Sequence, residues 1–246
     1  VVILCLVNVT GAGRTFFNQT AKDTRAKLDT VLGRHDVNGV YRGKNQYLLA
    51  DIKEMNEKKV QANVDAITNL AEDYSDVPMY MALIPDAANV WADKLPAYAP
   101  VEDQQAQIAQ IQSMLGESVN WVDAQSVMTA NKDKEIYYHT DSRWTTLGAN
   151  LVWQQIAADM GIETSKAPQL KPYAVTGDFS GNLSRTSGFI SGYREPIYAY
   201  LTEKVSDNIQ IVASYESEGV KTAELYDRTK LVEEDAYKVF LGGDYD

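Results

Sequence analysis

The feature that most constrains the fold is an alternation of helical and extended hydrophobic patterns in the first half of the chain. Apolar residues recur at helical spacing over 60–71, and an apolar run over 77–84 follows and ends at Pro85. A second helical pattern over 108–115 precedes a second apolar run over 119–123. Strands that alternate with helices are usually joined by crossovers and pair in parallel. The alternation therefore predicts an α/β fold with a doubly wound, mainly parallel sheet and helices on both faces.

Other patterns predict smaller elements around this sheet. Residues 20–32 are typical of a surface helix, and residues 38–49 of a β-hairpin with a glycine-containing turn. A helix is expected from Thr145 or Thr146 to about Met160, where Gly161 would end it.

The last third of the chain has a different character. From about residue 170 it is rich in β-forming residues, with strands expected at 209–215 and 236–241 and a polar, glycine-rich loop at 177–188. We therefore divide the chain into an N-terminal strand and helix segment, 1–36, and an α/β domain, 37–246, whose β-rich part begins near residue 170.

The composition excludes several kinds of partner and site. The 246 residues carry a formal net charge of -11 at a sequence pI of about 4.7, which disfavours nucleic acid or an anionic membrane surface as the main partner. Cys5 is the single cysteine, so neither an internal disulfide nor a zinc site built on several thiolates is expected. With only two histidines and no acidic spacing of the calcium-loop type, we predict no metal ion and no cofactor.

The chain begins with an apolar run, Val1 to Val7. This run is far shorter than the roughly 20 residues that span a bilayer. Two interpretations stay open: a buried strand, or the remainder of a signal or membrane anchor. A membrane is thus expected as a partner only through such an anchor.

The segment 137–149 is the most informative for chemistry. It reads Tyr-Tyr-His-Thr-Asp-Ser-Arg-Trp-Thr-Thr-Leu-Gly-Ala. It resembles the signature of the DHHW protein family, which is related to the alginate acetyltransferase group of SGNH-like esterases and acyltransferases. In that signature, Asp-x-His-Trp-Thr precedes the Gly-Ala start of a helix. Asp141 and Trp144 match it, whereas Arg143 occupies the position of the family's histidine.

Arg143 cannot take over the histidine's part in such a site. A guanidinium stays protonated, so it cannot accept a proton from a nucleophilic serine, although it can pair with Asp141 as a structural clamp. Residues two apart on an extended strand share a face, so we expect His139, Asp141 and Arg143 side by side. A displaced Asp141–His139 pair is therefore a second hypothesis. The charged residues 133–135 just before the motif are interpreted as a solvated turn.

The resemblance extends from about residue 37 to the end of the chain and rests on short segments that occur in the same order. These segments are 38–49, 84–85, 94–96, 122–123, 177–188 and 239–245. In the family, the nucleophilic serine lies in an Asp-Ser-Tyr block after the last of them, whereas this sequence stops at Asp246. The resemblance thus implies an SGNH or flavodoxin-like fold, incomplete towards the C-terminus, in a chain that is inactive as given.

The resemblance also implies a function outside the cytoplasm. Family chemistry is transfer of an acetyl group to a hydroxyl of a cell-surface polysaccharide, or the corresponding ester hydrolysis, through an acyl-serine intermediate. The alternative is a non-catalytic protein that binds a cell-envelope glycan. Asp141 and His139 are the candidate catalytic residues. The candidate glycan-binding residues are Tyr138, Arg143, Trp144, Asn182 and Ser184. Trp144 has a second interpretation, a core anchor at the start of a helix.

Overall fold

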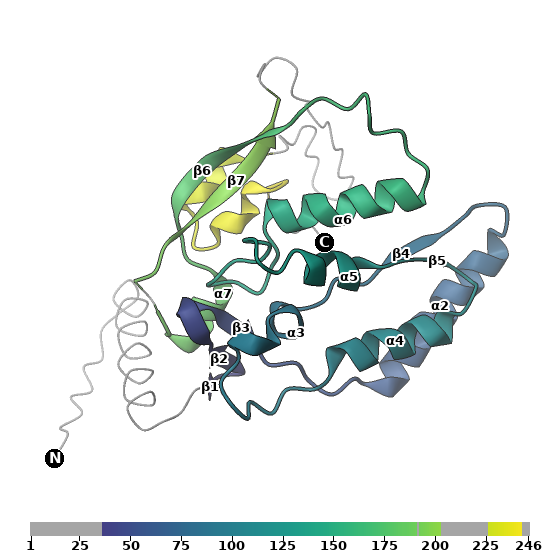
Figure 1. Ribbon diagram of the computed structural model, residues 1–246, viewed down its shortest axis with the longest axis horizontal. Coiled ribbons are helices and arrows are strands. Elements are labelled where there is room, and N and C mark those ends of the chain that lie inside the picture. Colours follow the sequence, from purple (N-terminus) through teal and green to yellow (C-terminus); the bar gives the residue numbers. More distant parts are fainter. Residues whose placement is uncertain (1–35, 191, 203–225, 243–246) are drawn as a thin grey trace, which may run out of the picture.

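The computed structural model describes residues 36–190, 192–202 and 226–242, which form three small sheets with helices packed around them (Figure 1). The mixed α/β content predicted from the sequence is confirmed. Among the described residues, however, the only parallel sheet has two strands. The predicted doubly wound sheet is therefore not found in this part of the chain.

The first sheet is antiparallel and confirms the predicted hairpin. Its elements are β1 (Asp36–Val37), β2 (Val40–Arg42), the 3-10 helix η1 (Lys44–Gln46) in the turn, and β3 (Leu48–Ala50). Leu48 and Leu49 are completely buried in two different hydrophobic clusters. Successive residues of a strand point to opposite faces, so this short strand joins two parts of the core.

A parallel pair of strands lies at the centre of the α/β part. The elements, in chain order, are α2 (Glu57–Asp73), β4 (Tyr80–Ala82), α3 (Ala87–Val90), the 3-10 helix η2 (Ala92–Lys94), α4 (Gln104–Leu115) and β5 (Asn120–Val122). The register of β4 and β5 places Met81 opposite Trp121, and α4 crosses between them, which confirms the predicted βαβ unit. Asp103 caps α4 by accepting from the Ala106 N–H, and Gly116 ends it with φ of 54°.

Helices cover both faces of this parallel pair. On one face, Met81 and Trp121 pack with the neighbouring helices α2 and α4 around Val64 and Leu115, and the two helices lie side by side in Figure 1. On the other face, Ala82 packs against the main core. The apolar run 77–84 indicates a buried strand, but β4 within it is only half-buried. In a two-stranded sheet each strand has one unpaired edge, so neither strand is enclosed.

The main core is closed by two helices that flank the motif. These are α5 (Ala124–Ala130) and α6 (Thr146–Asp159). Thr145 caps α6 by accepting from the Gly148 N–H at 3.2 Å, as predicted. A Cβ atom on Gly148 would lie 2.4 Å from the carbonyl oxygen of Ile136, so only glycine lets α6 approach the segment before the motif this closely.

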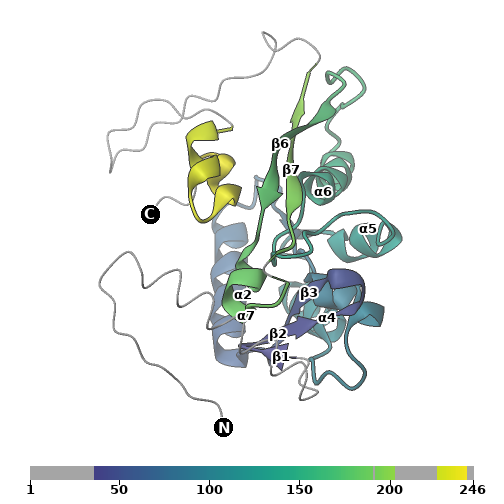
Figure 2. The same ribbon diagram turned by 90° about the vertical axis from the view of Figure 1, so that its left-hand side faces the viewer.

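The last part of the described chain forms a twisted hairpin with helical turns around it. Its elements are β6 (Lys171–Phe179), α7 (Asn182–Ser187), β7 (Glu195–Leu201) and the 3-10 helices η4 (Arg228–Val232) and η5 (Ala236–Val239). β6 and β7 pair antiparallel. Figure 2 shows η4 and η5 on one side of this hairpin and α6 on the other. Phe179 and Ile197 pack with Tyr138 and Val239 in a separate hydrophobic cluster.

Two local predictions in this part are wrong. Residues 177–188 were expected to be a loop, but β6 continues to Phe179 and α7 follows, because Leu183 packs into the cluster around Leu48. Residues 236–241 were expected to be a strand. They begin instead with η5, which starts where the Asp235 side chain accepts from the Tyr237 N–H at 3.3 Å. The elements expected at 1–7, 20–32 and 209–215 lie outside the described residues.

Candidate active site and an adjacent pocket

The motif forms a tight loop and not the extended strand expected from its sequence. Tyr137 pairs with Trp144 in an isolated antiparallel bridge, and the residues between them turn back on themselves. Thr140 holds the loop in this shape, because its N–H and its hydroxyl both donate to the Glu195 carboxylate. The expectation that the side chains of residues 139, 141 and 143 share one face is therefore wrong.

Arg143 forms the predicted clamp on Asp141. Its Nε and Nη2 atoms donate to the two carboxylate oxygens of Asp141 at 2.7 and 2.8 Å. Its Nη1 and Nη2 atoms also donate to Asp235 at 3.1 and 2.8 Å, and its guanidinium carbon lies 3.9 Å from the centre of the Tyr237 ring. Asp141 is completely buried, so Arg143 is the counter-ion that permits its charge there.

The Arg143 cluster shifts the ionisation of its members. Burial opposes the charged form of Asp235, but hydrogen bonds from Arg143 and its charge outweigh burial and lower the pKa of that carboxyl below its ordinary value. For Arg143 burial acts against the charge as well, and the bonds to Asp141 and Asp235 raise its pKa. The guanidinium is thus held more firmly protonated than a free arginine and has no capacity to act as a base.

The start of α7 completes the surroundings of Asp141. The Asn182 N–H donates to Asp141 Oδ2 at 2.8 Å, and the Asn182 side chain bonds the backbone N–H and the hydroxyl of Ser142, each at 3.1 Å. Gly181 is in such close contact that a Cβ atom on it would lie 2.3 Å from the Cβ atom of Asp141. The Ser184 hydroxyl donates to the carbonyl of Phe189, just after the end of α7, at 3.0 Å. Asn182 therefore holds the motif loop through Asp141 and Ser142, whereas the Ser184 side chain bonds within its own segment.

His139 pairs with a different carboxylate from the one expected. Its Nε2 atom lies 2.8 Å from a carboxylate oxygen of Glu135, and its Nδ1 atom 3.3 Å from the Tyr193 hydroxyl. The imidazole is also stacked between two rings, with centroids 3.7 Å from Tyr47 and 5.3 Å from Tyr193. The displaced pair proposed for Asp141 and His139 is not formed, because Arg143 and Asn182 occupy the Asp141 carboxylate. A Glu135–His139 pair takes its place.

Glu195 is a buried carboxylate that anchors the loop to β7. It accepts the backbone N–H groups of His139 and Thr140, both at 2.8 Å, in addition to the Thr140 hydroxyl. Burial raises the pKa of Glu195, although these hydrogen bonds act in the opposite direction. No lysine or arginine forms an ion pair with Glu195 in the part of the chain that the structure describes. Its charge is therefore stabilised by these three hydrogen bonds and by the attraction of His139.

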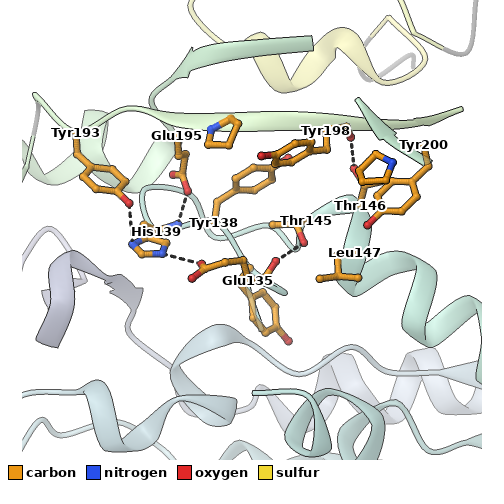
Figure 3. A pocket seen from close by; sticks show the side chains of 13 residues that line it. Glu135, Tyr138, His139, Thr145, Thr146, Leu147, Tyr193, Glu195, Tyr198 and Tyr200 are labelled. Carbon is orange, nitrogen blue, oxygen red and sulfur yellow. Dashed lines mark hydrogen bonds and ion pairs between the residues drawn. The ribbon is translucent and has the colours of Figure 1, made fainter. Parts of the chain in front are cut away.

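A pocket of about 470 Å³ lies beside His139, between β7 and the start of α6 (Figure 3). Pro196, Tyr198 and Tyr200 line it from alternate positions of β7, and Thr146 joins the two walls by donating to the Tyr198 carbonyl at 2.6 Å. The other lining residues are Glu135, Tyr137, Tyr138, His139, Thr145, Leu147, Pro172, Tyr193 and Glu195. Five of the 13 lining residues are thus tyrosines, and the His139 imidazole is the single basic side chain among them.

The predicted site residues fall into two groups. Tyr138 and His139 line the pocket, whereas Asp141, Arg143, Asn182 and Ser184 form the bonded cluster behind the loop. Trp144 packs against the main core and does not line the pocket. Glu135, interpreted as part of a solvated turn, also accepts from the Tyr47 hydroxyl at 3.1 Å and lies at the pocket.

The pocket residues on β7 were not predicted, although the sequence contains a signal for them. In the stretch from Glu195 to Leu201, Ile197 and Ala199 alternate with Pro196, Tyr198 and Tyr200. Ile197 and Ala199 are completely buried, whereas the other three are not. This alternation indicates a strand with one face in the core, so Pro196, Tyr198 and Tyr200 had to share the other face.

The described ranges contain no cluster of three or more histidine, cysteine or acidic residues that is arranged to hold a metal ion. In the same ranges, no helix has the length and apolar character needed to cross a membrane.

Three solved structures have a fold similar to this one, and all are remote in sequence. The O-acetyltransferase domain of Pseudomonas putida AlgJ is 19% identical with a TM-score of 0.53, over 66% of this chain and 63% of that one. A DHHW family protein from Eubacterium siraeum is 17% identical with a TM-score of 0.63, over 85% and 69%. Bacillus cereus PatB1, solved with a sulfonyl adduct, is 17% identical with a TM-score of 0.64, over 86% and 72%. These likenesses show a shared fold.

The chain belongs to the family described as the SGNH hydrolase-like domain of the acetyltransferase AlgX, whose pattern matches residues 40–244. This match covers most of the sequence and confirms the resemblance to the DHHW and alginate acetyltransferase group. A search of curated proteins found no match. The chain spans less than two thirds of the AlgJ domain.

Proposed function

We propose that this chain is part of an extracytoplasmic protein that acts on a cell-surface polysaccharide, and that the Asp141 site does not by itself transfer or hydrolyse acetyl groups. The polysaccharide and the location are what the resemblance to the DHHW and alginate acetyltransferase group implies, and membership of a family described as an acetyltransferase domain supports that resemblance. It also supports the finer expectation that the chain contributes to a doubly wound sheet of the SGNH type, of which β4 and β5 would be the central pair.

The observation that carries the proposal is the bonding of Arg143. An SGNH-type reaction needs a base that takes a proton from the nucleophile, and in the family an aspartate and a histidine share that task. Here a permanently protonated guanidinium saturates both oxygens of Asp141. A site without its base is expected to lose several orders of magnitude in rate.

Hydrolysis of p-nitrophenyl acetate by the full-length protein tests this proposal. The wild-type protein is expected to show no turnover above background, and the variant Arg143→His is expected to gain at least about tenfold, because an imidazole at residue 143 adjoins Asp141. Arg42→His, on an exposed position of β2, is the matched control and should gain nothing. Wild-type turnover that disappears in Asp141→Asn would contradict the proposal.

A separate set of variants tests whether the Glu135–His139 pair acts in catalysis. If the wild-type protein has turnover that is abolished by His139→Ala and by Glu135→Gln but not by Asp141→Asn, the base is His139 and the catalytic position has moved to the pocket. Labelling with a serine-directed phosphonate in the same variants would show whether a nucleophile is activated.

Binding of a glycan without chemistry is the second candidate function, and the tyrosine-lined pocket favours it. Rings such as Tyr198 and Tyr200 offer flat apolar surfaces beside hydrogen-bonding hydroxyls, which suits the mixed character of a sugar. A glycan that raises the unfolding temperature of the wild-type protein, with no release of acetate, would support this function.

A further inference from the structure

We propose that the tyrosine-lined pocket binds a sugar unit that carries a free, protonated amino group. This inference rests on the proposed binding of a glycan and specifies the kind of sugar. It depends on three properties of the lining: its net charge, its aromatic surface and its unused hydrogen-bonding capacity.

The charge of the lining favours a cation. Glu135 and Glu195 contribute two carboxylates, and His139 is the single basic residue among the 13 side chains that line the pocket. With His139 neutral, the two carboxylates also outnumber the Lys94 ammonium, which is not part of the lining but is attracted to Glu135. An anionic sugar such as a uronate would be repelled, whereas an ammonium group would be attracted.

The aromatic surface suits the same ligand. Tyr198 and Tyr200 lie on the pocket face of β7, next to Pro196, and a sugar ring can pack its C–H groups on such a surface. Tyrosine rings also attract ammonium groups through their electron-rich faces. The chain itself has an example close by, because the Lys94 ammonium lies 3.5 Å from the centre of the Tyr47 ring and 3.6 Å from that of Trp91.

The polar groups of the pocket have capacity for the three N–H donors of an ammonium. The Glu135 side chain is 68% exposed, and both of its internal partners, Tyr47 and His139, approach within 3.1 Å only at Oε2. Its Oε1 atom is thus the less occupied acceptor. Tyr138 also lines the pocket, and its hydroxyl is buried with no hydrogen-bond partner among the described residues. A buried hydroxyl without a partner is costly unless a ligand or water completes it.

Glu195 adds a preference for a positively charged ligand. Burial raises the pKa of this carboxyl, although its hydrogen bonds and the attraction of His139 act in the opposite direction. A cation in the pocket would add a further favourable charge beside Glu195, whereas a neutral hydroxyl or acetamide would not.

Three trisaccharides that differ only in the group at carbon 2 test the inference. They share a β-1,4-linked glucose backbone and carry an amine, an N-acetyl group or a hydroxyl, and their binding to the full-length protein is measured by calorimetry in near-neutral buffer, where the carboxylates of the pocket are charged. The amine trisaccharide is expected to bind at least about tenfold more tightly than the other two. Glu135→Gln should remove most of this preference, while Glu72→Gln, the loss of an exposed charge on α2, should preserve it.

Each other outcome is decisive. Equal binding of all three sugars, or tighter binding of the acetylated or neutral one, would overturn the inference and leave the glycan-binding function standing. No binding of any of them would count against both. If Glu135→Gln binds none of the sugars, circular dichroism establishes whether it is folded, and Tyr198→Ala then replaces it. That variant should weaken all three sugars together if the rings form the binding surface.

Discussion

Arg143 changes what Asp141 can do. Next to a histidine, a buried aspartate orients an imidazole and stabilises its positive charge. Next to a guanidinium that also bonds Asp235, the same carboxylate becomes half of a buried ion pair. Such pairs add little net stability because desolvation offsets the attraction, but loss of one partner leaves an uncompensated charge. The residue at the position of the family's catalytic histidine thus has a structural role, because Arg143 holds Asp141 and Asp235 together.

We expect the variant Arg143→Met to be strongly destabilised. It leaves Asp141 completely buried without its counter-ion, which should lower the free energy of unfolding by about 3 kcal/mol. Urea denaturation measures this. Arg42→Met, on the exposed position of β2, is the control and should change stability by less than about 0.5 kcal/mol. Equal effects of the two substitutions would show that Asp141 finds other compensation.

The contribution of Asp235 should depend on pH. Its pKa is lowered in the folded protein, so the stability it adds is complete above its unfolded value of 3.8 and is lost as the pH falls through the folded pKa. The difference in unfolding free energy between wild type and Asp235→Asn should therefore shrink as the pH falls from neutral into this acidic range. A difference that stays constant with pH would mean that the Asp235 charge is not coupled to folding. Urea titrations at a series of pH values would distinguish the two.

At the scale of elements, the contact between α7 and the motif loop determines the site. The Gly181 N–H donates to the Thr140 hydroxyl at 2.8 Å, and the Ser184 N–H to the Thr140 carbonyl at 3.1 Å. These bonds, with the one from Asn182 to Asp141, fix the loop against the start of α7. Such close approach of two backbones is possible only because residue 181 has no side chain.

Gly181→Ala should therefore displace α7 from the loop. The added methyl group would lie 2.3 Å from the Asp141 Cβ atom and 2.5 Å from the Thr140 carbonyl oxygen, both far inside ordinary contact. Overpacking of this kind costs about 1–3 kcal/mol, and backbone neighbours that cannot move place this variant at the upper end. Gly177→Ala in β6 is the matched control, since nothing lies within 4 Å of the added methyl, and its unfolding temperature should stay near that of wild type. An equally small effect of both would contradict the close packing of α7.

At the scale of the whole molecule, the pocket lies where parts distant in sequence meet. Glu135 lies just before the motif and His139 within it, Tyr198 comes from β7, and Thr146 is the first residue of α6. The cluster behind the loop brings Asp235 to Arg143 across 92 positions of the chain. No segment contains the site alone, so its shape depends on the docking of the β6–β7 hairpin against α6.

The features that were predicted correctly depend on residues close together in the sequence. Helices α2, α4 and α6 and the hairpin of β2 and β3 follow from local periodicity, caps and turns, which are encoded within a few residues. The pairing of Arg143 with Asp141 could also be predicted from the sequence, because the partners are two residues apart. His139 was assigned to the wrong carboxylate, since the choice between Asp141 and Glu135 depends on the bend of the loop.

By itself, the sequence determined the family, the α/β class, the βαβ unit and the replacement of a histidine by Arg143, because these are properties of residue identity, order and short-range spacing. Only the tertiary structure decided that the motif is bent, that α7 replaces a loop, and that Glu135, Glu195 and the tyrosines of β7 surround one pocket. The physical reason is that each of these depends on groups far apart in the chain. The anchoring of Thr140 by Glu195, across 55 positions, fixes the bend, and no local pattern in the sequence records that contact.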